Sequence, residues 1–395
     1  MKILHVIASL APRDGGPPVA CRDMARAAAR AGHAVTIYTT DWDGPGRLDV
    51  TPETPREEDG VRVVYFPVGF PRILKTSPRL ARRLWRDFHE FDVVHVHGLY
   101  LFHDWVVARC LAATTPASRA TVLVHTHGGL LPSVRRRHGW LKGLMNLLFQ
   151  NRLLRGSRGV VFTSSREERL SLPHLPPTRH WILPLGIDVA RFRDLPAGSF
   201  RQHRPKLAGR HLILFLGRLH FVKGLDLLCQ AMARVREVHE DAHLVLAGGD
   251  DTGFGATLRR LIDENGLASR VTLTGPLDRD EADAALADAA LLVLPSYGEN
   301  FGLAVVEAMA AGRPVVVSDQ VGIADEVGAA GAGLVVALET APLAEAICTI
   351  LADPVGAAAM GEKGRALAAE RFSLEALTAG LEDFYRALST GEAGR

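Results

Sequence analysis

The sequence has few of the features that mark disulfide-rich or membrane-spanning proteins. It contains only four cysteines in 395 residues, far apart and without metal-ligand or redox spacing, namely Cys21, Cys110, Cys229 and Cys348. Such cysteines fit a reducing cytoplasm and ordinary core positions. No apolar run approaches the roughly 20 residues that a membrane span needs, and residues 1–10 alternate like a strand rather than resembling a signal peptide. We therefore expect a soluble cytoplasmic protein.

Two phosphate-binding motifs are also missing. The chain has no P-loop, which excludes the common phosphoryl-transfer enzymes, and its G-D-D-T-G-F-G stretch has the wrong glycine spacing for a dinucleotide fingerprint. A dehydrogenase is excluded for that reason. With 47% hydrophobic residues the chain is apolar enough for two cores, and it is too long for one ordinary domain.

Short apolar segments alternate with helical patterns along the whole chain. Because strands that alternate with helices form parallel sheets, we expect an α/β fold with doubly wound sheets. A glycine pair, Gly15 and Gly16, joins the first strand to the first helix and permits close approach of a ligand, although a plain tight turn is the alternative. The predicted strands are residues 2–7, 34–39, 61–66, 92–96, 121–124, 159–163, 212–216, 243–247, 271–274, 291–294, 315–318 and 333–337.

Charge is distributed unevenly although the net charge is only +2. Residues 1–190 carry 26 Lys and Arg against 16 Asp and Glu, and the excess gathers from Arg72 to Arg86 and from Arg135 to Arg158, where basic residues alternate with Leu, Trp and Phe. This pattern is typical of a helix lying on an anionic membrane, here the inner face of the membrane. An amphipathic helix covering its own core reads the same way, and both interpretations stay open. No nucleic-acid-binding module is recognisable.

Residues 290–319 carry the strongest local signal. A buried-type strand, a loop of turn formers, a helix predicted over residues 301–311 and a second strand form one β-α-β unit, with Gly312 at the helix end. The backbone N–H groups of Asn300, Phe301 and Gly302 lie at the positive end of that helix, where an anion fits.

Two carboxylates flank this predicted anion site. Glu299 precedes the helix and Glu307 lies about one and a half turns into it. Because carboxylates accept hydrogen bonds and repel phosphate, the hydroxyls of a sugar are suitable partners. The alternative is that both are ordinary solvated helix charges.

Histidines gather at the ends of two predicted strands. His95 and His97 belong to V-V-H-V-H-G, and His125 and His127 to V-H-T-H-G-G. Four imidazoles could suggest a metal site, but no carboxylate spacing completes one, so structural roles at strand ends are the competing interpretation.

The segment P-S-Y-G-E-N-F-G-L-A-V-V-E-A-M-A-A-G-R-P-V resembles the signature of retaining glycosyltransferases of family 4 (group 1) with the GT-B fold. The similarity extends over nearly the whole chain: G-R-x-x-x-x-K-G at Gly217 to Gly224 matches the diphosphate-binding segment, T-H-G-G at Thr126 to Gly129 is similar to a P-H-G motif, and L-P-L-G-I-D resembles P-N-G-I-D with Leu185 in place of asparagine.

The resemblance implies two Rossmann-like domains facing a cleft. Residues 1–186 would bind the acceptor, residues 187–374 would bind a nucleotide-sugar donor, and a C-terminal helix in residues 375–395 would pack back on the first domain. Gly16, Arg218, Lys223, Asn300, Phe301, Gly302, Leu303 and Glu307 would bind the donor, with Glu307 on the ribose. Glu299 and His127 would lie beside the reacting sugar. The base would lie near residues 248–251 and 271–276.

The expected chemistry needs no divalent metal. Arg218, Lys223 and the helix terminus would stabilise the leaving diphosphate, and the D-x-D pairs Asp41 with Asp43 and Asp278 with Asp280 read as polar loops. We expect transfer of a hexose to a glycan or lipid-linked acceptor in cell-surface polysaccharide or glycolipid synthesis, without a cofactor. A non-catalytic sugar-nucleotide-binding protein on the same scaffold is the alternative.

Overall fold

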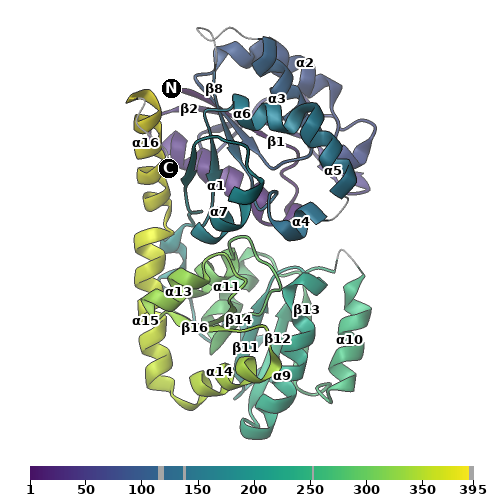
Figure 1. The fold of residues 1–395 in the computed structure, drawn as a ribbon. Helices are drawn as coiled ribbons and strands as arrows, with labels where there is room; N and C mark the ends of the chain where they lie inside the picture. Colours follow the sequence, from purple (N-terminus) through teal and green to yellow (C-terminus); the bar gives the residue numbers. More distant parts are fainter. Residues whose placement is uncertain (114–119, 137–138, 251–252, 391–395) are drawn as a thin grey trace. The chain divides into compact units, whose positions relative to one another are not determined.

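The protein forms two compact units (Figure 1). The structure is a computed structural model that describes residues 1–113, 120–136, 139–250 and 253–390. Unit 1 contains Met1–Gly186 and Leu374–Arg395, and unit 2 contains Ile187–Ser373. Each unit is an α/β domain built on one parallel sheet.

Unit 1 is built on an eight-stranded sheet of order β10-β9-β8-β7-β1-β2-β6-β5, parallel except for β5. Its strands are β1 (Lys2–Ile7), β2 (Ala34–Thr40), β5 (Arg56–Glu58), β6 (Val61–Phe66), β7 (Val93–His97), β8 (Thr121–His125), β9 (Gly159–Phe162) and β10 (His180–Ile182), with a separate β3–β4 hairpin (Trp42–Asp43, Gly46–Arg47). Its helices are α1 (Gly16–Arg30), α2 (Pro78–Asp87), α3 (Phe102–Ala113), α4 (Pro132–Arg136), α5 (Gly139–Met145), α6 (Asn151–Gly156), α7 (Ser165–Ser171) and α16 (Leu374–Thr390), with a π-helix, η5 (Asn146–Gln150), between α5 and α6.

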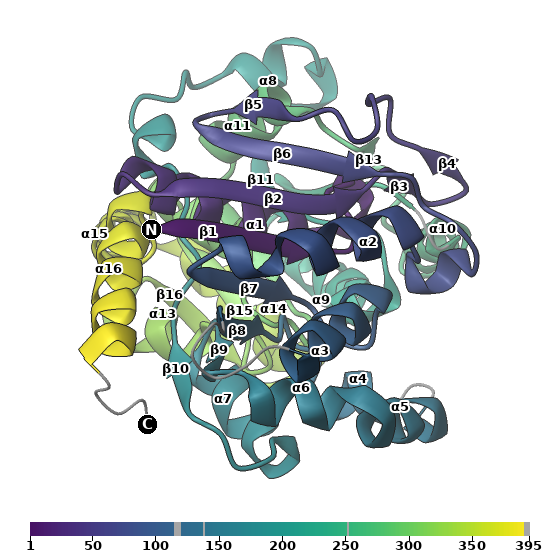
Figure 2. The same cartoon turned by 90° about the horizontal axis from the view of Figure 1, so that it is seen from above.

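Helices cover both faces of this sheet, as the alternating pattern predicts. On one face α2, α3 and α6 bury residues such as Leu80, Val107 and Leu153 against Val94 and Val124. On the other face α1 and α16 pack over the remaining side chains (Figure 2). The second face also carries the histidines, because His5 lies between Leu4 and Val6, whose side chains point to the first face, and His95 is its neighbour in register on β7.

Unit 2 is built on a six-stranded, fully parallel sheet of order β13-β12-β11-β14-β15-β16. The strands are β11 (His211–Leu216), β12 (Ala242–Ala247), β13 (Val271–Gly275), β14 (Leu291–Leu294), β15 (Val315–Ser318) and β16 (Gly333–Val336). The helices are α8 (Ser199–Gln202), α9 (Leu225–Val238), α10 (Phe254–Glu264), α11 (Arg279–Asp288), α12 (Leu303–Ala310), α13 (Ala324–Ala330), α14 (Thr340–Ala352) and α15 (Pro354–Arg371). Buried strands such as β14 consist of Leu and Val alone, as expected for a sheet covered on both faces.

Every strand predicted from the sequence is present, and two details differ. Strand β10, which the sequence did not predict, pairs with β9 and carries Trp181. The Trp181 ring covers Gly159, where a Cβ would lie 1.9 Å from the ring. The C-terminal helix predicted in residues 375–395 corresponds to α16, which begins one residue earlier, at Leu374, after a break at Phe372 and Ser373 that separates it from α15. Phe372 is buried, its carbonyl accepts from the Ile187 N–H (2.8 Å), and its ring packs edge-on against Phe301.

The described helices differ from membrane spans in length or hydropathy. No single helix is long and apolar enough to cross a membrane, whereas α14 and α15 reach that length and hydropathy only as a pair, bent by 103°.

Candidate active site

The loop after β14 carries the predicted donor residues of unit 2. Helix α12 begins at Leu303, two residues later than predicted, because Gly302 adopts a left-handed φ of 103° just before it. Phe301 therefore lies before the helix, and its side chain is buried in the core. No side chain caps α12 at its N-terminus, so its first N–H groups remain suited to a ligand anion.

Glu299 and Lys223 form an ion pair within unit 2. Each side chain is 19% exposed, so the pair lies partly out of water. Lys223 ends the short 3-10 helix Phe221–Lys223, which follows β11, and Glu299 lies in the loop after the neighbouring strand β14. The sequence predicted both side chains at this edge of the sheet but not their direct contact.

Two backbone contacts bring these loops together. The Tyr297 N–H donates to the Val222 carbonyl (2.8 Å). A Cβ on Gly224 would lie 2.0 Å from the Pro295 carbonyl oxygen, and Gly224 has a φ of 67°. Glycine is therefore required here for both space and conformation.

The segment after β15 supports the Glu299 loop from the other side. The Glu299 N–H donates to the Gln320 carbonyl (3.2 Å), and Glu299 forms an isolated bridge with Val321. A Cβ on Gly322 would lie 1.9 Å from the Asn300 carbonyl oxygen. The D-Q-V-G-I segment thus holds the loop through its backbone.

Glu307 projects from α12 between the buried residues Val306 and Ala308 and is itself half-buried. Because α12 starts at Leu303 and not at residue 301, Glu307 lies about one turn into the helix, which is closer to its N-terminus than the predicted one and a half turns.

Arg218 follows β11 and is exposed. Within the described chain its guanidinium makes no ion pair or hydrogen bond. Next to it Gly217 and Gly248 approach so closely that a Cβ on Gly248 would lie 1.8 Å from the Gly217 carbonyl oxygen. The backbone segments that follow β11 and β12 therefore pack closely together. Arg218 lies next to this contact and can bind an anion there.

The region predicted for the base is only partly described. Asp251 lies outside the described residues, and the Asp250 carboxylate accepts from the Gly255 N–H (2.9 Å).

The D-x-D pairs are engaged by protein groups. Asp41 is buried and accepts from the Val68 N–H (2.7 Å) and the Arg47 guanidinium (2.8 Å), while Asp43 pairs with Arg13. Asp278 caps α11 by accepting from the Glu281 N–H (2.8 Å), so this second pair lies at a helix start and not in the polar loop that we expected.

In unit 1, His127 lies in a tight turn after β8. His127 and Gly128 both have positive φ, 45° and 77°, and the Gly129 N–H donates to the Thr126 carbonyl (2.8 Å). This is the pattern of a type I′ turn. Histidine is among the residues that tolerate this conformation.

A buried carboxylate that the sequence did not point to holds this turn. Glu167 accepts from the Thr126 hydroxyl (2.5 Å) and the Gly128 N–H (2.6 Å), and from both the N–H and the hydroxyl of Thr163 (2.7 and 2.8 Å). The threonine that replaces the proline of the P-H-G motif is thus used as a donor. The sequence signal available was Ser164-x-x-Glu167, a capping box, in which Ser164 accepts from the Glu167 N–H.

Gly16 is the first residue of α1, at the carboxyl end of β1. Gly15 before it requires glycine because its φ is 76°, whereas a Cβ on Gly16 would meet nothing within 4 Å. Open space above Gly16 suits the approach of a ligand.

The histidines form hydrogen-bonded rows beneath α1 and α16. His5 bonds to His97 (2.9 Å) and His97 to His127 (3.0 Å), while His95 bonds to His125 (2.7 Å) and to the Tyr385 hydroxyl (2.9 Å). Burial lowers the pKa of His5 to about 3 and that of His127 to about 4. These rings are neutral at neutral pH.

One group among the described residues has the spacing of a metal site. Ligand atoms of His5, Cys21 and His97 lie within 4.8 Å of one another. Burial raises the pKa of the Cys21 thiol far above its usual value, so the thiol keeps its proton, whereas metals bind the thiolate.

The two basic stretches differ in structure. In α2, Leu80 and Leu84 are buried in the core of unit 1, and Arg79, Arg83 and Arg86 pair with Glu53 or Asp87. From Arg135 to Arg158 the chain forms the end of α4, then α5, η5 and α6. Helix α6 buries Leu153 and Leu154 in the core of unit 1, whereas α5 lies at the edge of the unit (Figure 2). This segment exposes the side chains of Trp140, Leu141, Leu144, Leu147 and Leu148, from 37% to 81%. Arg137 lies outside the described residues.

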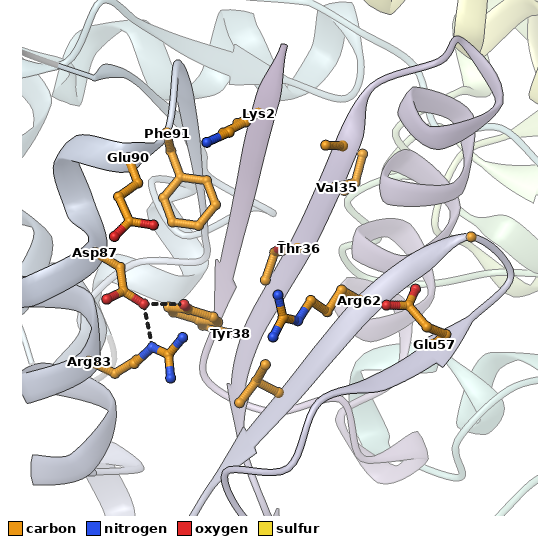
Figure 3. Close-up of a pocket in the computed structure, with 13 residues that line it drawn as sticks. Lys2, Val35, Thr36, Tyr38, Glu57, Arg62, Arg83, Asp87, Glu90 and Phe91 are labelled. Carbon is orange, nitrogen blue, oxygen red and sulfur yellow. Dashed lines mark hydrogen bonds and ion pairs between the residues drawn. The ribbon is translucent and has the colours of Figure 1, made fainter.

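A cavity of about 390 Å³ lies at the other end of the unit 1 sheet, near the amino ends of β1 and β2 (Figure 3). In it Asp87 accepts from the Tyr38 hydroxyl (2.8 Å) and pairs with Arg83. Burial would raise the pKa of Asp87, but hydrogen bonds from Arg86, Tyr38 and Arg83 outweigh it and lower the pKa. These polar groups satisfy one another, and none of the predicted site residues lines the cavity.

Two parallel-sheet units, with an uncapped helix and paired charges at strand ends, define a GT-B glycosyltransferase fold. Solved structures agree: sucrose-phosphate synthase from Thermosynechococcus elongatus matches 99% of this chain and 100% of its own (TM-score 0.82, 25% identity). HepE from Anabaena, in complex with UDP and glucose, matches 98% and 100% (TM-score 0.76, 21% identity).

Sequence comparison identifies the family. Residues 14–191 match the model of Glycosyltransferase Family 4, and residues 210–353 that of Glycosyl transferases group 1. The GDP-mannose-dependent alpha-(1-6)-phosphatidylinositol monomannoside mannosyltransferase of Mycobacterium tuberculosis is 30% identical over 98% of both chains. The GDP-mannose:cellobiosyl-diphosphopolyprenol alpha-mannosyltransferase of Xanthomonas oryzae is 28% identical over 81% of this chain and 79% of its own. The chain belongs to glycosyltransferase family 4 and is a glycosyltransferase.

Proposed function

We propose that the protein is a retaining, metal-independent glycosyltransferase that moves a hexose from a nucleoside-diphosphate sugar to a glycan or lipid-linked acceptor in cell-surface polysaccharide or glycolipid synthesis. The Lys223–Glu299 ion pair beside the uncapped start of α12 is the observation that carries this proposal. It joins a cation suited to a diphosphate with a carboxylate suited to sugar hydroxyls. GDP-mannose is the donor to test first, because both relatives above are named for it.

The chemistry follows from where charge develops. Breaking the bond between sugar and phosphate places negative charge on the departing diphosphate and positive charge on the ring carbon. Lys223, Arg218 and the N-terminus of α12 would stabilise the diphosphate, and preorganised groups of this kind supply several kcal/mol. Retention implies that the acceptor attacks the face from which the diphosphate leaves, so a diphosphate oxygen can take the acceptor proton. His127 would then hydrogen-bond the sugar without acting as an obligatory base.

The donor assignment is tested by ligand-induced thermal stabilisation. A panel of GDP, UDP, ADP and their sugar conjugates is added to the protein, and a nucleotide at about 100 times its Kd should add roughly 2.7 kcal/mol. We expect one nucleotide to raise the melting temperature, and Glu307→Ala to reduce that shift. Absence of any shift in the unaltered protein would contradict the donor site.

Turnover is tested with Glu299→Ala. This variant should lose transfer, measured as release of nucleoside diphosphate in the presence of acceptor, while nucleotide-induced stabilisation survives. Glu370→Ala, an exposed carboxylate elsewhere in unit 2, is the control and should transfer normally. Normal turnover by Glu299→Ala would remove the role given to Glu299.

We also propose that the exposed apolar face of α5 and η5 contacts anionic membrane. Trp140, Leu144, Leu147 and Leu148 recur at helical spacing, and Lys142, Arg152 and Arg155 lie in the same segment. Protein should float with vesicles containing anionic phospholipid and less with neutral vesicles. Trp140→Ser combined with Leu147→Ser should abolish flotation, whereas Trp85→Ser on α2 should not, because α2 uses its apolar side in the core. Equal flotation of all variants would refute this contact.

A further inference from the structure

The row of histidines His5–His97–His127 connects the core of unit 1 to the turn that carries His127. His5 lies on β1 and is fully buried, His97 lies on the adjacent strand β7 and is 1% exposed, and His127 follows β8, the next strand. Nδ1 of His5 bonds Nε2 of His97, and Nδ1 of His97 bonds Nε2 of His127. Successive rings are nearly parallel, with centroids 5.1 and 5.2 Å apart.

Each hydrogen bond in this row needs one proton, which links the tautomers of the three rings. A neutral imidazole has one N–H and one acceptor nitrogen. The protons therefore lie either all on Nδ1 or all on Nε2, because a mixed arrangement would leave two lone pairs or two N–H groups facing each other.

The buried end of the row decides between the two arrangements. Nε2 of His5 is buried and has no hydrogen-bond partner among the described residues. A proton there would be an unpaired buried N–H, which is rarer in folded proteins than an unpaired acceptor. The arrangement with protons on Nδ1 avoids it. His5 then donates to His97, His97 donates to His127, and the Nδ1 of His127 keeps its own proton.

We propose that His5 and His97 are positioning residues that hold His127 in the Nδ1–H tautomer, so that His127 offers a neutral hydrogen-bond donor to an oxygen atom of the bound substrate. That the oxygen belongs to a sugar rests on the proposed function. Nδ1 is the nitrogen that the row leaves for an outside group, and His127 is only half-buried.

The second row in the same layer lacks this property. It runs from Tyr385 on α16 through His95 to His125, and its last nitrogen, Nδ1 of His125, is buried without a partner among the described residues. Of the two rows, the one through His97 reaches a predicted site residue. Other groups packed around it include the Cys21 thiol from α1, the rings of His95 and His125, and His103, whose ring hydrogen-bonds the His97 carbonyl (3.0 Å).

The test is nitrogen NMR of protein labelled with ¹⁵N-histidine, without donor or acceptor. Two-bond proton–nitrogen correlations distinguish a protonated from an unprotonated ring nitrogen, and His127→Gln identifies the signals of His127. We expect a protonated Nδ1 and an unprotonated Nε2 in the unaltered protein. A proton on Nε2 of His127 would overturn the proposal. The tautomer is measured in the unaltered protein, and His127→Gln serves only to assign the His127 signals.

His97→Phe keeps a stacked ring and removes the donor to His127. The His97 N–H then no longer holds the proton of His127 on Nδ1, so the Nε2–H tautomer, which free histidine favours, should appear in the His127 signals. His95→Phe, from the other row, is the matched control and should leave His127 unchanged. An unchanged tautomer in folded His97→Phe would overturn the role of His97.

Zinc addition tests the alternative use of the same atoms. Zinc held by His5, Cys21 and His97 would take the lone pairs that the row needs, so stoichiometric zinc bound at this group would overturn the proposal, and failure of zinc to alter the His127 signals supports it. Because none of these readings uses transfer activity, a protein with the expected tautomer but no transferase activity would refute the proposed function alone.

Discussion

At the scale of single residues, buried polar groups decide how the site is held. Glu167 shows this for the His127 turn, since four donors from Thr126, Gly128 and Thr163 converge on its two carboxylate oxygens. The turn follows β8 and α7 follows β9, so this one side chain fastens the ends of two neighbouring strands.

Glu167→Ala should therefore destabilise the protein. Removing the acceptor leaves buried donors unpaired, and we expect a loss of about 2–4 kcal/mol, measured by urea unfolding. Glu375→Gln, an exposed carboxylate of α16, should change stability by less than about 0.5 kcal/mol. If Glu167→Ala also lost less than about 0.5 kcal/mol of stability, water would be replacing the carboxylate.

Sequence reasoning reached some of these residues and not others. Glu299 and Lys223 were expected at the same edge of one sheet because each follows a buried-type strand, and the strands carrying them are neighbours. Glu167 was missed because its capping box predicts only a local helix start. Its partner Thr126 lies 41 residues earlier in the chain, and no local pattern reports a contact at that separation.

At the scale of elements, the loops after β11 and β14 must meet for Lys223 to contact Glu299. Gly224 makes this possible by bringing the backbone against Pro295, as described above. Element types were predictable from apolar periodicity, whereas the start of α12 and the break between α15 and α16 were not. Those boundaries depend on the backbone conformation of Gly302 and on the burial of Phe372, which are tertiary effects.

Gly224→Ala tests the contact between these loops. A side chain would require a left-handed backbone and would overlap the Pro295 carbonyl, so we expect a loss of about 1–3 kcal/mol in urea unfolding and weaker nucleotide binding. Gly249→Ala is the matched control for the stability measurement, because its Cβ would meet nothing within 4 Å and its φ is not left-handed. Equal stability of the two variants would show that the loops separate easily.

At the scale of the whole molecule, the neutral histidines link stability to pH. Burial lowers the pKa of His5 to about 3 and those of His103 and His127 to about 4, and it is the main cause that holds the pKa values of His95, His97 and His125 well below 6.5. The unfolded chain binds protons at these rings below pH 6.5, and the folded chain does not. Stability is thus complete above about pH 6.5 and falls as the pH decreases.

The expected slope is about 1.4 kcal/mol per pH unit for each such histidine. Melting temperatures measured from pH 8 to pH 5 should be flat above pH 7 and fall steeply below 6.5. His5→Phe should make the fall shallower, and His203→Gln, at an exposed position, should not. A melting temperature that stays constant down to pH 5 would show that the histidines are protonated in the folded protein.

The core of unit 1 is completed by helix α16, which is synthesised after all of unit 2. Leu377, Leu381, Phe384 and Tyr385 complete the core beneath α1, yet a ribosome produces them only after all of unit 2. During synthesis, the part of the unit 1 core that α16 covers therefore stays exposed until all of unit 2 (Ile187–Ser373) has been made. A message cut short before Leu374 would yield an unfinished first unit with an apolar seam, which chaperones and proteases recognise, so that only a completely translated chain reaches a fully covered fold.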